Sequence, residues 1–263
     1  MKTSKNKVLL TCDHHLRYLE DIKNNFVNLD LIAPKINKQT LNADEMRELL
    51  SEVEYAIIGD DIVDHSTLEN NKNLKHLIKW GVGIDSVNMN AVKENDICFY
   101  HTPGVFSDEV ADLALGFLLS IERGIHTTNK KVVNGLWEQF IGNSLRQKKA
   151  FIIGLGSIGS EICKRLESFG VNVSGYDPYV ETQIEYKTID HGCKESDYIF
   201  LACNLTNENK HVINKNLIKK MKRGVVLVNI SRGGLVCEKS IIEGIEDGII
   251  KAVGLDAVSY THL

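Results

Sequence analysis

The sequence predicts an α/β fold with two parallel sheets, and three observations lead to this prediction. Segments with the length of strands alternate with amphipathic helical segments along the 263 residues, as in parallel sheets that carry helices on both faces. The glycine-rich stretch Gly154–Gly159 joins an apolar strand to a helix. Polar loops follow several apolar strands, which is where parallel α/β sheets bind their ligands.

Composition restricts the class of protein. Hydrophobic residues make up 43% and charged residues 25% of the chain, as in soluble globular proteins. The formal net charge of -4 gives no reason to expect a nucleic acid or an anionic membrane as partner. No apolar run approaches the roughly 20 residues of a membrane span, and the first residues are typical of a strand rather than a signal peptide.

The six cysteines are scattered along the chain and show no CxxC pair and no metal-ligand spacing with histidine. Most lie in or beside apolar runs, where a reduced thiol behaves as a small hydrophobic side chain. We therefore expect no metal site and no disulfide framework, and we expect a cytoplasmic protein.

The first predicted domain covers residues 1–100 and is flavodoxin-like, with short buried strands and intervening helices. Asn42 and Glu45 have the spacing of a capping box, which marks the start of a helix. The predicted strands and helices, in chain order, are Lys7–Cys12, Leu16–Asn25, Leu29–Ala33, Asn42–Leu50, Tyr55–Ile58, Ser66–Asn70, Leu74–Trp80 and Ile97–Tyr100.

The second predicted domain covers residues 101–263 and is Rossmann-like. Its first residues, His101-Thr-Pro-Gly104, predict a hinge, because the proline disfavours helix and the glycine frees the backbone. A long helix is predicted over Ser107–Glu122, and a second helical stretch carries Trp137. The remaining predicted elements are Ala150–Ile153, Val171–Tyr176, Tyr198–Cys203, Asn214–Met221, Val225–Asn229, Glu238–Asp247 and Ala252–Leu255.

The glycine-rich stretch predicts a dinucleotide site. Gly154 permits a tight turn, Gly156 lets the backbone approach a pyrophosphate, and Gly159 lets helix and strand pack closely. The amides at the start of the helix then face the phosphates. Asp177 stands at the end of the next strand, roughly 20 residues on, where an acid accepts hydrogen bonds from an adenosine ribose. A plain βαβ unit is the alternative.

Arg232 is the candidate for substrate binding. It follows the apolar strand Val225–Asn229 and precedes two glycines, and a guanidinium binds a carboxylate in bidentate geometry. An arginine that pairs with a surface acid would give the same pattern, so this alternative stays open.

Several stretches together resemble the D-2-hydroxyacid dehydrogenase family, in particular its phosphoglycerate-dehydrogenase-like branch. They are KWGVGIDSVN, HTPGVFSDEVADLALGFLL, IIGLGSIG with YDPY, VVLVNISRGGLV and KAVGLD. The resemblance runs from about Tyr55 to Asp256. It implies an enzyme that moves a hydride between a nicotinamide cofactor and a D-2-hydroxy or 2-oxo acid.

The resemblance also implies a role for each matching residue. Asp177 would bind the adenine ribose and favour NAD over NADP, because an acid repels a 2′-phosphate. Arg232 would hold the substrate and stabilise charge on its 2-oxygen during hydride transfer. The pyrophosphate would contact Gly154, Gly156, Ser157, Ile158 and Gly159; the nicotinamide half would contact Cys203, Ile230, Ser231 and Asp256; and the substrate would also contact Val82 and Gly83. Cys203 could equally be plain core, and Asp256 could simply cap the last strand.

The sequence departs from the family pattern after KAVGLD. The glutamate and the histidine expected there match no residue, and Thr261 stands where the glutamate would be. We expect that the second domain is truncated, that the first lacks its C-terminal return, and that this chain has little activity, because a lost general acid/base costs ~10²–10⁴ in rate. We expect the intact protein to be a homodimer, through Ser107–Glu122 and the segment around Trp137.

Substrate and functional class stay open at this point. Asp60 and Asp61 would repel a phosphate, with Lys79 or Arg232 as partial compensation. A small 2-oxo acid such as glyoxylate, hydroxypyruvate or pyruvate is therefore favoured over a phosphorylated substrate. A non-catalytic NAD(H)-responsive regulator on the same fold is the alternative from another class, and the NISRGG turn counts against an amino-acid dehydrogenase.

Overall fold

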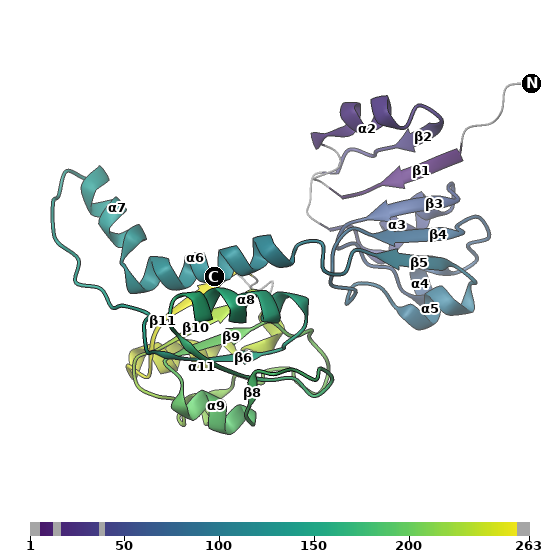
Figure 1. Cartoon of the computed structure of the whole chain (residues 1–263). Helices are drawn as coiled ribbons and strands as arrows, with labels where there is room; N and C mark the ends of the chain where they lie inside the picture. Colours follow the sequence, from purple (N-terminus) through teal and green to yellow (C-terminus); the bar gives the residue numbers. More distant parts are fainter. Residues whose placement is uncertain (1–5, 13–16, 37–39, 257–263) are drawn as a thin grey trace, which may run out of the picture. The chain divides into compact units, whose positions relative to one another are not determined.

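The computed structural model describes residues 6–12, 17–36 and 40–256. The chain divides into two compact units, Met1–Val105 and Phe106–Leu263, and each contains one parallel sheet (Figure 1). The division falls after Val105 rather than near Tyr100. The reason is that the last strand of the first sheet reaches His101 and the loop after it stays bound to the same unit: the Thr102 amide donates to the Gly81 carbonyl at 3.1 Å.

The N-terminal unit contains a five-stranded sheet in the order β2-β1-β3-β4-β5. The capping box predicted at Asn42 is present, with the Asn42 side chain bound to two backbone amides and the Glu45 side chain bound to the Asn42 amide. The elements are β1 (Asn6–Leu10), α2 (Leu19–Asn25), β2 (Leu29–Ile32), α3 (Ala43–Leu50), β3 (Tyr55–Ile58), α4 (His65–Leu68), β4 (His76–Lys79), α5 (Met89–Glu94) and β5 (Cys98–His101).

The helices α3, α4 and α5 pack against one face of this sheet. The core on that face joins side chains of α3, α4 and α5 to alternate strand residues; it includes Leu9, Met46, Leu50, Ala56, Ile58, Leu68, Leu77, Ala91 and Val92. The opposite face carries the stacked rings of Tyr55, His76 and Tyr100, with centroids 5.1 and 6.2 Å apart. Tyr100 is 53% exposed.

The C-terminal unit contains a six-stranded sheet in the order β11-β10-β9-β6-β7-β8. All its registered strand pairs are parallel. The elements are α6 (Ser107–Glu122), α7 (Ile125–Val133), β6 (Lys149–Ile153), α8 (Ser157–Ser168), β7 (Asn172–Tyr176), β8 (Glu185–Tyr186), α9 (Ile189–Glu195), β9 (Tyr198–Leu201), α10 (Lys215–Ile218), β10 (Val225–Asn229), a 3-10 turn (Gly233–Leu235), α11 (Glu238–Glu246) and β11 (Ile250–Leu255).

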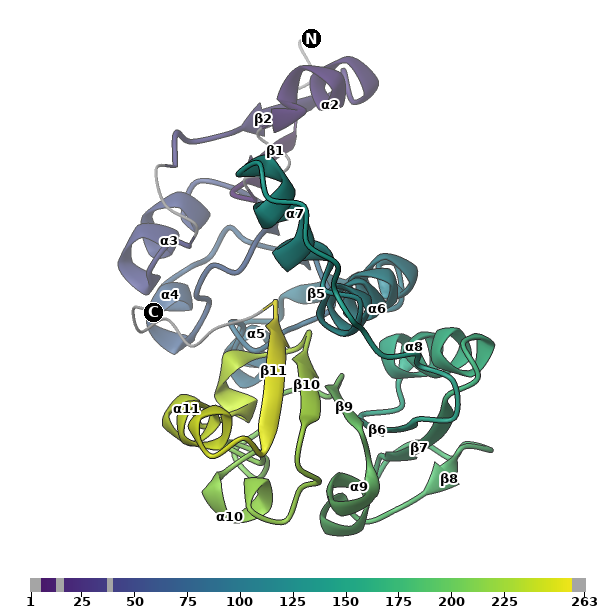
Figure 2. The ribbon, with the colours of Figure 1, turned by 90° about the vertical axis from the view of Figure 1, so that its left-hand side faces the viewer.

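This second sheet is covered on both faces, as predicted. Helices α6 and α8 pack on one face, and α9, α10 and α11 pack on the other (Figures 1 and 2). Phe151 and Phe200, on neighbouring strands, are fully buried on opposite faces. No helix of the described residues is both long and apolar enough to cross a membrane.

An arginine connects the two helices on the first of these faces. Arg165 of α8 forms ion pairs with Asp108 at 2.8 Å and Asp112 at 2.7 Å, both on α6, and with Glu161 of its own helix at 2.7 Å. Its side chain is 22% exposed. The pairs fix the N-terminal half of α6 against α8.

The segment after α6 differs from its prediction. Helix α7 ends at Val133, so Trp137 lies in the following loop, where it is 91% exposed. The loop returns to the end of α6: an added Cβ on Gly124 would lie 2.5 Å from the Phe140 ring. Phe169 is 44% exposed, because it is the C-cap residue of α8 and lies beyond the last helical turn.

Candidate functional site

The glycine-rich turn has the geometry that its sequence predicts. Gly154 has φ +99°, a conformation that side chains disfavour. A Cβ on Gly159 would lie 2.0 Å from the Gly154 carbonyl oxygen, so only glycine lets α8 pack this closely. A Cβ on Gly156 would meet no atom within 4 Å. The backbone at Gly156 therefore has open space beside it, as a bound pyrophosphate requires.

The start of α8 is suited to an anion. Gly156 is its N-cap residue and has no side chain to accept from the first-turn amides, so these amides and the helix dipole are available to a phosphate. Ser157, exposed, and Ile158, half-buried, form the first turn. The turn lies between β6 and β9, where the strand order reverses: β7 follows β6 on one side and β9 lies on the other. Ligands bind α/β sheets at this switch point.

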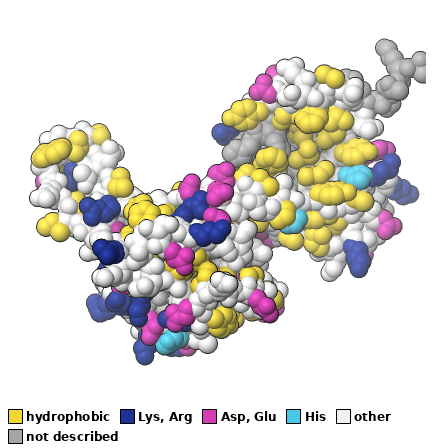
Figure 3. Space-filling view, in the orientation of Figure 1, with side chains coloured by type: hydrophobic (Ala, Val, Ile, Leu, Met, Phe, Trp, Pro, Cys, Tyr) yellow, Lys and Arg dark blue, Asp and Glu magenta, His cyan; other side chains and the backbone are white. Residues whose placement is uncertain are grey.

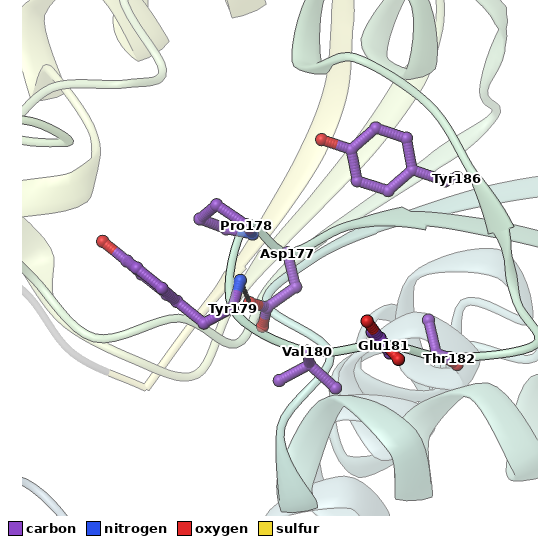
Figure 4. A pocket seen from close by; sticks show the side chains of 7 residues that line it. All are labelled: Asp177, Pro178, Tyr179, Val180, Glu181, Thr182 and Tyr186. Carbon is purple, nitrogen blue, oxygen red and sulfur yellow. Dashed lines mark hydrogen bonds between the residues drawn. The ribbon is translucent and has the colours of Figure 1, made fainter.

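Asp177 is fixed by two backbone amides. One carboxylate oxygen accepts from Leu155, inside the glycine turn, at 2.8 Å, and the other accepts from Tyr179 at 2.9 Å. A carboxylate has about four acceptor sites, so capacity remains for ribose hydroxyls. Asp177 lines a pocket with Pro178, Tyr179, Val180, Glu181, Thr182 and Tyr186 (Figure 4). A second acid, Glu181, thus lies in the same pocket.

Cys203 follows β9 and lies against the glycine turn. A Cβ on Gly154 would come within 2.6 Å of the Cys203 backbone nitrogen. Burial, together with the nearby charge of Asp177, raises the pKa of the Cys203 thiol to about 11. The thiol therefore stays protonated at neutral pH and is not a nucleophile. A contact through its backbone, on the nicotinamide side of the switch point, fits this position.

The loop after β10 is organised by a residue that the sequence analysis did not assign. Asn229 is fully buried; its side chain donates to the Arg232 carbonyl at 2.9 Å and accepts from the Ser231 amide at 3.0 Å. Its own carbonyl accepts from the Asp256 amide at 3.0 Å. A polar residue that ends a fully apolar strand was the available signal. Asn229 fixes the backbone on which Ser231 and Arg232 are carried.

Arg232 is half-buried and its guanidinium remains near its own loop. It donates to the Ser231 carbonyl at 3.1 Å. The Ser231 hydroxyl in turn donates to the Leu201 carbonyl of β9 at 3.1 Å. Ile230 is buried, and Asp256, which follows β11, is exposed. The structure thus places the predicted cofactor residues of this unit and Arg232 on loops at the carboxyl edge of one sheet.

Val82 and Gly83 belong to the N-terminal unit. The neighbouring Gly81 is held at both backbone groups, because its amide donates to the Thr102 hydroxyl at 3.0 Å and its carbonyl accepts from the Thr102 amide. In contrast, the amides of Val82 and Gly83 make no hydrogen bond with any other described residue. Both amides are therefore available to a ligand.

The two acids after β3 have different roles from those expected. Asp61 is 2% exposed, and its carboxylate accepts hydrogen bonds from Thr11, from the Leu41 amide and from the Gly59 amide. It therefore closes the loop internally and presents no acidic surface. Asp60 is half-exposed and pairs with Lys79 at 2.9 Å. The simple repulsion of phosphate by two free acids is an incorrect interpretation.

The cysteine side chains differ in their exposure to solvent. All six are free thiols, and Cys12, Cys163 and Cys193 are buried, as their apolar surroundings in the sequence predict. Cys98, however, is exposed on β5. In the described part of the chain, no group of three or more His, Cys, Asp or Glu side chains could hold a metal ion.

Comparison with known proteins agrees with this geometry. The profile of the family described as "D-isomer specific 2-hydroxyacid dehydrogenase, NAD binding domain" matches residues 115–262. The chain is 35% identical over 228 residues to a hydroxypyruvate reductase of Thermotoga maritima. The matched region covers 84% of this chain and 74% of that relative. It is 32% identical over 226 residues to a D-3-phosphoglycerate dehydrogenase of Methanocaldococcus jannaschii, covering 82% of this chain but 43% of that relative.

A solved structure extends the likeness to the fold. The crystal structure of the TT0316 protein from Thermus thermophilus has a TM-score of 0.84 and 26% identity, and the match covers 98% of this chain and 83% of that chain. A glycine turn at the switch point, with an acid after the next strand, defines a dinucleotide-binding α/β protein. The chain belongs to the D-isomer specific 2-hydroxyacid dehydrogenase family, which confirms the resemblance seen in its sequence motifs.

Proposed function

We propose that this protein is an NAD-dependent oxidoreductase that interconverts a D-2-hydroxy acid and its 2-oxo acid. The observation that supports this most strongly is the carboxyl edge of the second sheet. It carries an uncapped helix start at Gly156, the fixed carboxylate of Asp177 and the cation of Arg232 on loops of one sheet. The nicotinamide cofactor supplies or accepts the hydride, and the residues of the chain bind and orient both molecules.

We propose that the cofactor is NAD rather than NADP. Ribose hydroxyls donate to a carboxylate, whereas a 2′-phosphate is repelled by it. Asp177 cannot turn away easily, because the Leu155 and Tyr179 amides hold both of its oxygens. Glu181 adds a second negative charge to the same pocket. Gly154, Gly156, Ser157, Ile158 and Gly159 hold the pyrophosphate in this proposal, and Cys203, Ile230, Ser231 and Asp256 contact the nicotinamide half.

We propose that Arg232 binds the substrate carboxylate and stabilises negative charge on the 2-oxygen during reduction. A guanidinium suits both tasks, because it offers two parallel donors and a permanent charge. The unpaired amides of Val82 and Gly83 are the contribution of the N-terminal unit to carboxylate binding. A small 2-oxo acid such as glyoxylate, hydroxypyruvate or pyruvate remains the proposed substrate, now with Asp60, the exposed one of the two acids after β3, disfavouring a phosphate.

Proton transfer is assigned to no described side chain. We expect the chain to bind NADH. Binding measurements are for this reason the decisive ones.

Fluorescence titration with NADH and NADPH tests the cofactor assignment. The wild-type chain is expected to bind NADH at least about 10-fold more tightly than NADPH, and Asp177→Ala should reduce this ratio to near one. The ratio is the readout, because the substitution also frees the Leu155 amide and weakens both cofactors alike. Tighter binding of NADPH by the wild-type chain would contradict the assignment.

Oxamate, a 2-oxo acid isostere that NADH does not reduce, tests the substrate site. The NADH-loaded chain should bind oxamate, and Arg232→Gln should weaken oxamate at least about 30-fold while it changes NADH affinity less than about 3-fold. Binding of NADH without any binding of oxamate would instead favour the non-catalytic NAD(H)-responsive regulator.

We also propose a homodimer and a cytoplasmic location for the intact protein. The dimer proposal rests on the segment after α6, where Val133, Trp137 and Ile141 are 77%, 91% and 92% exposed. Such an apolar surface typically marks a protein interface. Light scattering of the full-length protein and of its Trp137→Ser variant tests this, since a monomeric full-length protein would contradict the dimer. The location rests on the scattered, free cysteines.

A further inference from the structure

A buried cation lies directly beside the unpaired amides of the N-terminal unit. Lys79 is the last residue of β4, and its side chain is only 4% exposed. A Cβ on Gly81 would lie 3.2 Å from the Lys79 ammonium nitrogen, so the ammonium is in contact with the start of the loop that contains Val82 and Gly83. A positive charge thus lies against the proposed carboxylate seat.

The ammonium of Lys79 makes fewer hydrogen bonds to described residues than it has donors. It donates to the Asp60 carboxylate at 2.9 Å and to the Trp80 carbonyl at 3.2 Å. An ammonium has three donors, and the third has no described partner. Asp60 is 54% exposed, so water screens its charge, whereas the Lys79 side chain is buried.

Packing alone does not account for a lysine at this position. A buried ammonium loses its hydration, and a methionine of similar length fills the same space without that cost. The feature that a lysine adds is a fixed positive charge beside two unpaired amides. Its bond to the Trp80 carbonyl also fixes the peptide group that leads into Gly81.

We propose that Lys79 is the positioning residue of the substrate-anion site, and that Asp60 sets how much of its charge a ligand experiences. In this arrangement the pair selects substrates by charge: a monoanionic 2-oxo acid is bound, and a second negative charge is disfavoured as long as Asp60 is ionised. The inference rests on the proposed function, because it assigns the electrostatics of the same carboxylate site.

Three isosteric ligands test this inference: oxamide is neutral, oxamate carries one negative charge and oxalate carries two. Their dissociation constants are measured with the NADH-loaded full chain. Lys79→Met should weaken oxamate about 10-fold and oxalate more, and should leave oxamide unchanged. Asp60→Asn keeps Lys79 in place and should tighten oxalate more than oxamate. Lys79→Arg should restore most of the oxamate affinity.

A matched charge control is available beside the same strand. Lys75, which pairs with Glu54 at 2.9 Å at the other end of β4, is exposed. Lys75→Met makes the same change in net charge and should alter none of the three affinities. Equal weakening of all three ligands by Lys79→Met would indicate a structural role and would overturn the inference, as would an unchanged oxalate affinity in Asp60→Asn.

The outcome for the wild-type chain separates this inference from the proposed function. Failure of wild type to bind oxamate contradicts the proposed function itself. If wild type binds oxamate and Lys79→Met binds it equally well, only the role of Lys79 is wrong. Asp60→Asn keeps the inference testable even if Lys79→Met does not fold, because Asp60 is half-exposed and its removal leaves the buried lysine intact.

Discussion

The two sheets of this protein are both parallel, yet they are buried differently. The C-terminal sheet has helices on both faces, and the residues of β9 and β10 are all buried. In the N-terminal sheet, β3 and β4 alternate between buried and partly exposed residues. In Figure 3 the N-terminal unit shows a broad group of hydrophobic side chains on its visible side.

The strand sequences explain the difference. YIFL and VVLVN in the C-terminal unit are nearly continuous apolar runs, which is typical of strands buried on both faces. HLIK and CFYH in the N-terminal unit interrupt the apolar residues with histidine and tyrosine, which tolerate partial exposure. The rigid, two-sided sheet is the one that carries the glycine turn, so the cofactor site stands on the better packed support.

The largest expected effect on folding and NADH binding comes from replacing a glycine of the C-terminal unit, with a glycine of the N-terminal unit as control. Gly159→Ala forces a Cβ to 2.0 Å from a carbonyl oxygen, a contact that costs more than the ~1–3 kcal/mol of ordinary overpacking. We expect the C-terminal unit to lose its folded state or its NADH binding. Gly59→Ala is the matched control, because its Cβ would meet Cys12 at an ordinary 3.5 Å. Thermal unfolding measures both, and equal stability of the two variants would contradict the geometry.

An aromatic residue from each sheet gives the next largest effect. Phe200→Ala removes a fully buried ring from β9 and should cost about 3–5 kcal/mol of unfolding free energy. Tyr100→Ala removes a half-exposed ring from β5 and should cost less than about 1 kcal/mol. Urea unfolding followed by circular dichroism compares them. A cost at Tyr100 similar to that at Phe200 would show that the Tyr100 ring is covered in solution.

Thiol labelling compares the same two regions without mutation. Cys98 is exposed on β5, whereas burial raises the pKa of both Cys163 and Cys193 to about 12. Because the thiolate is the reactive form, iodoacetamide at pH 8 should modify Cys98 at least ~100-fold faster than either buried thiol. Peptide mass spectrometry measures the rates, with the unfolded chain as control. Slow modification of Cys98 in the folded protein would contradict its exposure.

The smallest expected effect is a pH dependence. Asp197 of the C-terminal unit is partly buried, and this burial by itself raises its pKa. Hydrogen bonds from Lys222 and from the Lys149 amide, together with the charge of Lys148, act in the opposite direction. The net result is a pKa below its usual value. The folded state therefore gains stability above the unfolded pKa of about 3.9, and this gain is lost as pH falls through the folded pKa.

Asp197→Asn should accordingly cost about 1 kcal/mol near pH 6, and this difference from wild type should shrink below about pH 4. Unfolding free energies measured between pH 2 and pH 6 test the prediction. Glu54→Gln in the N-terminal unit is the control, because its partner Lys75 is exposed and the pair is screened by water. A difference for Asp197→Asn that grew at low pH would contradict the sign.

Sequence reasoning was most accurate where a pattern is local. The bounds of α6 and β10 were predicted correctly from their apolar runs, and the capping box at Asn42 was confirmed. The glycine turn was identified from the local spacing of its glycines, and Gly154 and Gly159 are the two that local sterics require. Trp137 was misplaced in a helix, because the chain after α7 is fixed by the contact of Phe140 with Gly124, which no local pattern indicates.

The polar residues of the site were harder to interpret. Asn229 and Lys79 both end strands, and their roles depend on which loops a neighbouring strand brings to the same edge. Asp61 was treated as an exposed acid because its hydrogen-bond partners, Thr11 and the Leu41 amide, are distant in the sequence. Burial of a polar side chain follows from tertiary packing, so a single sequence identifies the residue but not what it contacts.

The ion pairs of Arg165 have a mechanical consequence. Helix α6 is the first element after the division between the units, and Asp108 and Asp112 join its first turns to α8. We expect that a dinucleotide bound at the start of α8 also stiffens residues 107–112, because Arg165 of α8 pairs with Asp108 and Asp112. Cofactor occupancy would then be transmitted as reduced hydrogen exchange in residues 107–112, and Arg165→Met would abolish that transmission while leaving the glycine turn intact.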